Sequence, residues 1–140
     1  MGIRKNTVNI KTALISVSDK SNLRKLLNLL KKYKIKTISS GGTYKKIQRM
    51  GFKCSEVSKF TNSKELLDGR VKTLHPKIHS GILNIRQNKK HQKEMKINDY
   101  KNIDLVIVNF YPFEKVLLSN SAHKNIIENI DIGGPTMVRS

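Results

Sequence analysis

Two turns rich in hydroxyl groups have the composition of anion-binding sites. The first is SVSDK at residues 16–20, and the second is SGGT at residues 40–43. A helix that begins at such a turn presents unpaired backbone N–H groups and the positive end of its dipole, and glycines let the backbone approach an oxyanion closely. Lys20, two residues after Ser18, would add a positive charge. Either turn alone could be an ordinary helix cap, but the pair favours a site for an anionic small molecule.

A pair of cations lies in a long irregular segment at residues 60–81. Arg70 and Lys72 would point the same way if their segment is extended, and like charges on one side repel each other unless an anion lies between them. A solvated basic loop is the alternative. Irregular stretches of this length are usually functional or disordered, and the spaced aliphatic residues here favour an ordered loop with short helical turns.

Polar groups also follow the clearest apolar run of the chain, DLVIVNF at residues 104–110. Asn109 and Tyr111 would project the same way from the end of an extended strand. Tyr111 could equally belong to the core, since an aromatic residue beside a proline often does. Further along, Asp131 precedes Gly133 and Gly134, and this combination leaves backbone N–H groups open to a ligand.

Metal binding is not expected from this sequence. His75 and His79 are four residues apart, but Pro76 lies between them and no carboxylate is close in sequence. Cys54 is the single cysteine, which excludes an internal disulfide and a cysteine-based metal site. We expect Cys54 to be a small buried hydrophobic residue.

The elements that must position these groups alternate between strand and helix. Short apolar, β-branched runs predict strands, and leucines at three- and four-residue spacing predict amphipathic helices. Strands separated by helices indicate an α/β fold with a parallel sheet covered on both faces, in which ligands bind beyond the carboxyl ends of the strands. The predicted strands are residues 12–17, 36–39, 53–57 and 104–110, and the predicted helices are residues 21–34, 44–50 and 91–96.

Length and composition indicate one domain in a soluble, cytoplasmic protein. The chain has 140 residues, and its apolar runs are shorter than the roughly 18 residues that a membrane span needs. The net charge is +18, from a composition with 22 lysines and only 2 alanines. Because the lysines run along the whole chain, most of this charge is interpreted as compositional drift, and no specific nucleic-acid partner is expected. An RNA-binding protein would instead gather its charge on one face, with aromatic residues interleaved.

Five motifs, in this order, resemble the IMP cyclohydrolase domain of the bifunctional purine biosynthesis enzymes that also carry AICAR formyltransferase. They are ISVSDK, SSGGT, DGRVKTLHPKIHSGIL, VNFYPF and ENIDIGGPTMVRS, and the match runs from about Ala13 to Ser140. The resemblance implies a methylglyoxal-synthase-like fold with a five-stranded parallel sheet. It also implies cyclisation of formyl-AICAR to IMP with loss of water, no metal or organic cofactor, and a homodimer.

The resemblance also assigns roles residue by residue. It implies that the catalytic groups are Lys72, Tyr111 and Asp131. It implies that the phosphate and ribose are held by Ser18, Lys20, Ser40, Gly41, Gly42 and Thr43, and that the base is surrounded by Arg70, Thr73, Asn109, Ile132 and Gly133.

One departure from the family bears on activity. In the family, the run that matches the end of this sequence continues through two alanines to a proton-transferring lysine and a last strand. Residues 1–140 are therefore expected to form an incomplete cyclohydrolase domain without the formyltransferase domain, able to bind nucleotide but nearly inactive. A regulatory domain of the same fold, as in carbamoyl-phosphate synthetase, is an alternative, but it would not be expected to carry RVKTLHP.

Overall fold

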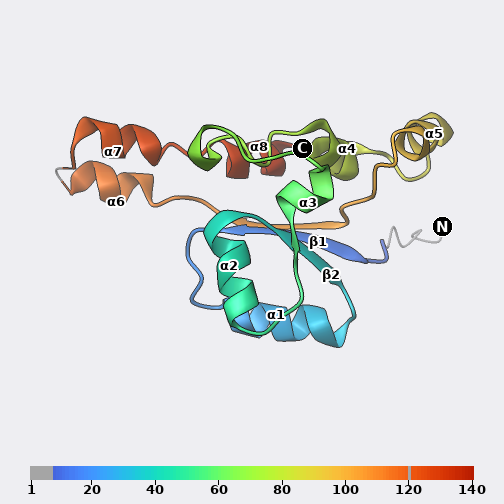
Figure 1. Cartoon of the computed structure of the whole chain (residues 1–140), viewed down its shortest axis with the longest axis horizontal. Coiled ribbons are helices and arrows are strands. Elements are labelled where there is room, and N and C mark those ends of the chain that lie inside the picture. The colour runs from blue at the N-terminus through green and yellow to red at the C-terminus, as the bar shows by residue number, and fades with distance from the viewer. Residues whose placement is uncertain (1–7, 120) are drawn as a thin grey trace, which may run out of the picture.

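A parallel sheet runs through the centre of the molecule (Figure 1). The computed structural model describes residues 8–119 and 121–140. In these residues four strands pair in the order β3-β2-β1-β4. Their bounds are Thr12–Val17 for β1, Lys36–Ser39 for β2, Ser55–Glu56 for β3 and Leu105–Asn109 for β4.

Helices cover both faces of this sheet, as the sequence predicts (Figure 1). The helices α1 and α2 lie on one face, whereas α3, α4 and α8 lie on the other, and α6 and α7 form a hairpin that projects from the body. The helical bounds are Leu23–Lys32 for α1, Gly41–Arg49 for α2, Val57–Thr61 for α3, Pro76–Leu83 for α4, Lys89–Ile97 for α5, Phe113–Leu118 for α6, His123–Glu128 for α7 and Gly133–Arg139 for α8, with a 3-10 turn at Leu67–Gly69.

Alternating side chains of the central strand β1 build two cores. Ala13 and Ile15 point to one face and pack in a cluster with apolar residues of α1 and α2. Leu14 points to the other face and packs with Ile78 of α4 and Met137 of α8. All three β1 side chains are fully buried, because this strand has a neighbour on each side and helices above and below.

Several expectations about local structure need correction. The segment expected as a strand at residues 53–57 pairs over only two residues, because Val57 already begins α3 and is buried there. The second helix begins at Gly41, not residue 44, so the glycines form its first turn. Cys54 is half-buried where a buried residue was expected, and desolvation raises the pKa of its thiol. In the described part of the chain, no helix is long and apolar enough to cross a membrane.

The start of the sheet is fastened by a charged cluster that sequence patterns do not reveal. The backbone N–H groups of Lys11 and Thr12 donate to the same carboxylate oxygen of Asp104, at 2.9 and 3.0 Å. The other oxygen lies 3.1 Å from the guanidinium of Arg86, which also donates to Asn102 and to the backbone of Ile103. This cluster joins the amino ends of β1 and β4 to the loop after α4.

Candidate functional site

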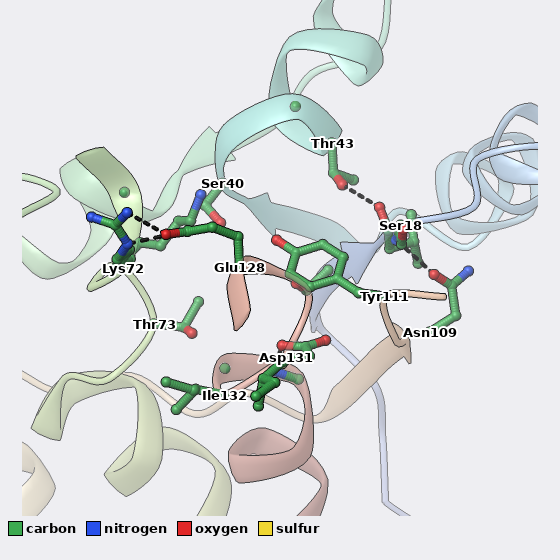
Figure 2. A pocket seen from close by; sticks show the side chains of 18 of the residues that line it. Ser18, Ser40, Thr43, Lys72, Thr73, Asn109, Tyr111, Glu128, Asp131 and Ile132 are labelled. Atoms are coloured by element: carbon green, nitrogen blue, oxygen red, sulfur yellow. Dashed lines mark hydrogen bonds and ion pairs between the residues drawn. The ribbon is translucent and has the colours of Figure 1, made fainter. Parts of the chain in front are cut away.

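A pocket of about 510 Å³ opens at the carboxyl ends of β1, β2 and β4. Five segments far apart in sequence meet there (Figure 2). They lie in the turn after β1, the start of α2, the irregular segment around residue 72, the end of β4, and the stretch from α7 into α8. Of the fourteen residues that the sequence nominates, the lining contains Ser18, Lys20, Ser40, Gly42, Thr43, Arg70, Lys72, Thr73, Asn109, Tyr111, Asp131, Ile132 and Gly133.

Gly41 is the nominated residue outside the lining, but it touches the same site. Its φ of +52° lies in the left-handed region that favours glycine, and a Cβ added there would lie 3.0 Å from the Nζ atom of Lys72. Gly69 has a φ of +83°, and a Cβ added there would lie 3.1 Å from the same Nζ atom of Lys72. The Lys72 side chain therefore fits between two glycines, and a larger residue at either position would displace its ammonium.

Lys72 adds a positive charge to the pocket. Its side chain is half-buried, and within the described residues it makes no hydrogen bond or ion pair. It lies close to the amino end of α2, where the helix dipole is also positive. An anion placed there would reduce the electrostatic repulsion between the two.

The start of α2 presents backbone donors to the same space. Its N-cap, Ser40, is extended and makes no side-chain capping hydrogen bond. The first N–H groups of a helix have no partner within the helix, and those of Gly42 and Thr43 have none elsewhere in the described chain. This turn has the geometry that the sequence predicts for an anion-binding site.

The turn after β1 is built differently from the prediction. The Oδ1 atom of Asn109 accepts from the N–H groups of Ser18 and Asp19, at 2.6 and 3.0 Å, and its Nδ2 donates to the Asp19 carbonyl at 2.9 Å. Helix α1 begins only at Leu23. The N–H groups of residues 18 and 19 are therefore not open to a ligand, because the Asn109 amide oxygen accepts from both.

Lys20 and Thr43 hold this turn in place. The ammonium of Lys20 donates to the carbonyls of Val17 and Ser18 at 3.0 and 2.9 Å, and the Thr43 hydroxyl donates to Val17 at 2.8 Å. Two of the three N–H donors of Lys20 are used in this way. Lys20 thus brings its charge to the pocket wall while it also stabilises the turn.

Arg70 is paired with an acidic residue that the sequence did not nominate. Its guanidinium binds Glu128 with two nitrogens, Nη2 to Oε1 and Nε to Oε2, the second at 3.2 Å. The hydrogen bond from Arg70 lowers the pKa of the Glu128 carboxyl. Glu128 was missed because 58 residues separate the partners, and the sequence signal was limited to its place at the head of the ENIDIGG motif.

The opposite wall contains Tyr111, Asp131 and Thr73. The Tyr111 ring extends into the pocket (Figure 2) and is 44% exposed, which excludes a core role. One oxygen of Asp131 accepts from the Gly134 N–H at 3.0 Å, in the first turn of α8. The Thr73 hydroxyl lies so close to Gly133 that a Cβ there would approach it to 2.7 Å.

The two histidines considered as metal ligands make hydrogen bonds at the start of α4 and between α4 and the end of α8. His75 is the N-cap of α4, and its Nδ1 accepts from the Lys77 N–H at 3.0 Å. The Nδ1 of His79 lies 2.8 Å from the Ser140 hydroxyl, at the end of α8. Neither side chain belongs to the pocket lining.

A family model and several curated proteins match most of this chain. The family model of the MGS-like domain matches residues 22–136. The bifunctional purine biosynthesis protein PurH of Rhodospirillum rubrum is 47% identical over 135 residues, which is 96% of this chain and 26% of that protein. PurH of Prochlorococcus marinus is 50% identical over 129 residues, 91% of this chain and 25% of that protein. The chain spans about a quarter of the length of these curated relatives.

A solved structure with the same architecture is the crystal structure of ForH. It superimposes with a TM-score of 0.76 at 30% identity, covering 94% of this chain and 67% of ForH. The parallel sheet with helices on both faces is thus shared with an experimentally determined protein.

Proposed function

The chain belongs to the MGS-like domain family, and we propose that within it this chain is the IMP cyclohydrolase domain of a bifunctional purine biosynthesis protein. It would close the second ring of formyl-AICAR to give IMP and water. The relatives that are about half identical carry the name of that bifunctional protein. The proposal assigns only this cyclisation to residues 1–140, and it includes the homodimer that the resemblance implies.

The observation that supports the proposal is that one pocket contains both the open backbone donors at the start of α2 and the side chains of Tyr111 and Asp131. The phosphate would bind the open N–H groups at the start of α2, including that of Thr43, together with the hydroxyl of Ser40. Lys20 and Ser18 would complete this end of the site. The base would then extend toward Tyr111, with Asn109 acting through the turn that it holds.

Lys72, beside the start of α2, and Tyr111 and Asp131 on the opposite wall fit the chemistry of cyclisation. The carboxamide nitrogen forms a bond to the formyl carbon, and the formyl oxygen leaves as water with one proton from each nitrogen. The Lys72 ammonium would stabilise the developing oxyanion, and the Asp131 oxygen that does not accept from Gly134 would accept a proton. Tyr111 would orient the carboxamide. Arg70, Thr73, Ile132 and Gly133 would surround the base.

Nucleotide binding tests the proposal directly. We expect IMP to bind in isothermal titration calorimetry, and inosine, which lacks the phosphate, to bind at least about tenfold more weakly because it leaves the α2 donors unpaired. Lys72→Ala should weaken IMP binding, while Lys96→Ala, at an exposed position on α5, should not. Equal affinities for IMP and inosine would contradict the proposed phosphate site.

Turnover tests the second half of the proposal. Conversion of formyl-AICAR to IMP changes the ultraviolet absorbance, so the purified chain can be assayed directly. The resemblance implies that a lysine beyond the matched run transfers protons, and acid–base assistance typically adds about 10² to 10⁴-fold. We therefore expect slow turnover from residues 1–140 and faster turnover from a chain extended through that lysine. Full turnover by the 140 residues would contradict this role for the lysine.

A further inference from the structure

Positive and negative residues are distributed differently along this chain. The segment from residue 20 to residue 55 contains eleven lysines and arginines and no aspartate or glutamate. The net charge of the whole chain is +18, so about a quarter of the residues carry 11 of these 18 charges. The lysines do run along the whole sequence, but the acidic residues that offset them do not.

The fold places the two helices of this acid-free segment on one side of the sheet. The segment forms α1, β2, α2 and the loops around them, and both helices pack on the same sheet face (Figure 1). Their apolar residues point inward, and ten of the eleven cations are exposed, all except the half-buried Lys20. We refer to the exposed lysines and arginines between residues 24 and 53 as the basic layer.

The basic layer has no internal counter-charge. In the described part of the chain, the ion pairs are Arg70 with Glu128 and Arg86 with Asp104, and both lie outside the layer. Its side chains therefore repel one another across the helix surface. A polyanion would relieve this repulsion and release its own condensed counterions on binding.

Aromatic side chains accompany these cations. Arg24 and Lys31 each lie 6.0 Å from the centre of the Phe52 ring, and Lys32 lies 5.9 Å from the ring of Tyr33. Tyr33 is 64% exposed and offers a surface on which a base can stack. The outward side of α1 has one large exposed apolar residue, Leu29, which is too little for insertion into a lipid surface.

We propose that the basic layer binds RNA through its backbone phosphates, without selecting a sequence. This surface meets the condition for RNA binding that composition alone did not show, since charge gathers on one face with aromatic residues between. The layer continues to the amino edge of the strands, where α1 and α2 end and β2 starts. The pocket lies at the opposite, carboxyl edge. RNA and nucleotide should therefore bind independently.

Fluorescence anisotropy with a labelled oligouridine of about 20 nucleotides measures this binding. The layer variant carries Lys31→Gln, Lys32→Gln, Lys45→Gln and Lys46→Gln. The matched control carries Lys89→Gln, Lys90→Gln, Lys93→Gln and Lys96→Gln on α5, where all four lysines are also helical and exposed. Both variants lose four charges, and glutamine keeps the helix propensity of lysine.

We expect the layer variant to raise the Kd at least about tenfold in low salt, and to flatten the slope of log K against log salt by up to about 3, since each lost phosphate contact contributes about 0.7. The control should change the Kd less than about threefold, and lysine-to-arginine changes at the four layer positions should preserve it. Saturating IMP should leave RNA binding unchanged.

Three results would overturn the proposal. Equal losses of RNA affinity in the layer variant and in the control would show that RNA binding depends on the net charge of the molecule and not on one of its faces. Competition between IMP and RNA would place the RNA in the pocket. Tighter binding to phosphatidylglycerol vesicles than to oligouridine at the same salt concentration would identify an anionic lipid surface as the ligand.

Discussion

Arg70 and Glu128 pose a problem for any anionic ligand of the pocket. Glu128 already binds the Arg70 guanidinium with both carboxylate oxygens. A nucleotide that contacts Arg70 must therefore compete with this carboxylate or accept its negative charge nearby. Two of the three basic side chains in the pocket lining are in different states, since Arg70 is paired and Lys72 has no partner in the described chain.

Replacing Glu128 tests this competition. Glu128→Gln removes the negative charge but keeps the side-chain shape, so IMP should bind about two- to fivefold more tightly in low salt, the modest size reflecting an exposed ion pair. The difference should shrink as salt rises. Glu94→Gln on α5 is the control, and calorimetry is the measurement. Weaker binding of IMP to Glu128→Gln would show instead that Glu128 holds Arg70 in its productive position.

Gly133 and Thr73 form a tight contact that fixes one wall of the pocket. A Cβ at residue 133 would lie 2.7 Å from the Thr73 hydroxyl oxygen, and Thr73 is buried. Gly133→Ala should therefore lower the free energy of unfolding by about 1 to 3 kcal/mol, as overpacking does. Adding Thr73→Ala should restore part of that loss, which urea denaturation of both single variants and the double variant would measure. Strictly additive effects would mean that the contact relaxes without strain.

The residues of the site were easier to predict than their roles. Residue patterns and the family resemblance together nominated thirteen of the lining residues, several of them at strand ends, which a parallel sheet gathers at one edge. Sequence patterns did not show that Asn109 binds the turn after β1, or that Glu128 pairs with Arg70. Both contacts join segments distant in sequence, and local spacing does not encode them.

At the scale of elements, prediction succeeded where burial is strong. The apolar runs of β1 and β4 and the leucine spacing of α1 predicted these elements to within two residues at each end. Prediction failed at residues 53–57, where a short apolar run is compatible with strand or helix. The hairpin of α6 and α7 was not predicted, since large apolar residues there, such as Leu118, are exposed and follow no clear period.

The cluster at Asp104 is an element-scale device that can be tested by one substitution. Three donors converge on this carboxylate, the N–H groups of Lys11 and Thr12 and the Arg86 guanidinium. Asp104→Asn turns an NH₂ group toward one of these donors and removes the charge that balances Arg86. We expect the free energy of unfolding to fall by about 1 to 3 kcal/mol in urea denaturation.

The exposed Glu94 provides the comparison for this change. Glu94→Gln also removes one acidic charge, but in the described chain its carboxylate forms no ion pair. Its effect should stay within about 0.5 kcal/mol. Equal effects of Asp104→Asn and Glu94→Gln would mean that loss of charge alone, and not the cluster, accounts for the change.

At the scale of the whole molecule, the fold separates two positive regions. The pocket lies at the carboxyl edge of the sheet, and the cations in its lining are Lys20, Arg70 and Lys72. The basic layer covers one sheet face and is exposed to solvent. Composition gives only the net charge of the whole chain, in which the two regions cannot be told apart. Compositional drift was a sufficient explanation for that net charge. The separation of the two positive regions depends on where α1 and α2 pack on the sheet. A count of residues carries no information about that packing.

This separation gives a prediction for the stability of the chain in salt. The cations of the basic layer repel one another in the folded state, and ions screen exposed charges over about 8 to 10 Å at physiological salt. Sodium chloride up to about 0.3 M should therefore raise the melting temperature, because the compact state gains most from screening.

The variant with glutamine at residues 31, 32, 45 and 46 should melt higher than the wild type in low salt and respond less to added salt. The α5 variant loses the same four charges where Glu94 already lies among them, so it should keep more of the wild-type salt response. A melting temperature that falls as salt is added would mean that favourable ion pairs, and not repulsion within the layer, dominate the electrostatics of the fold.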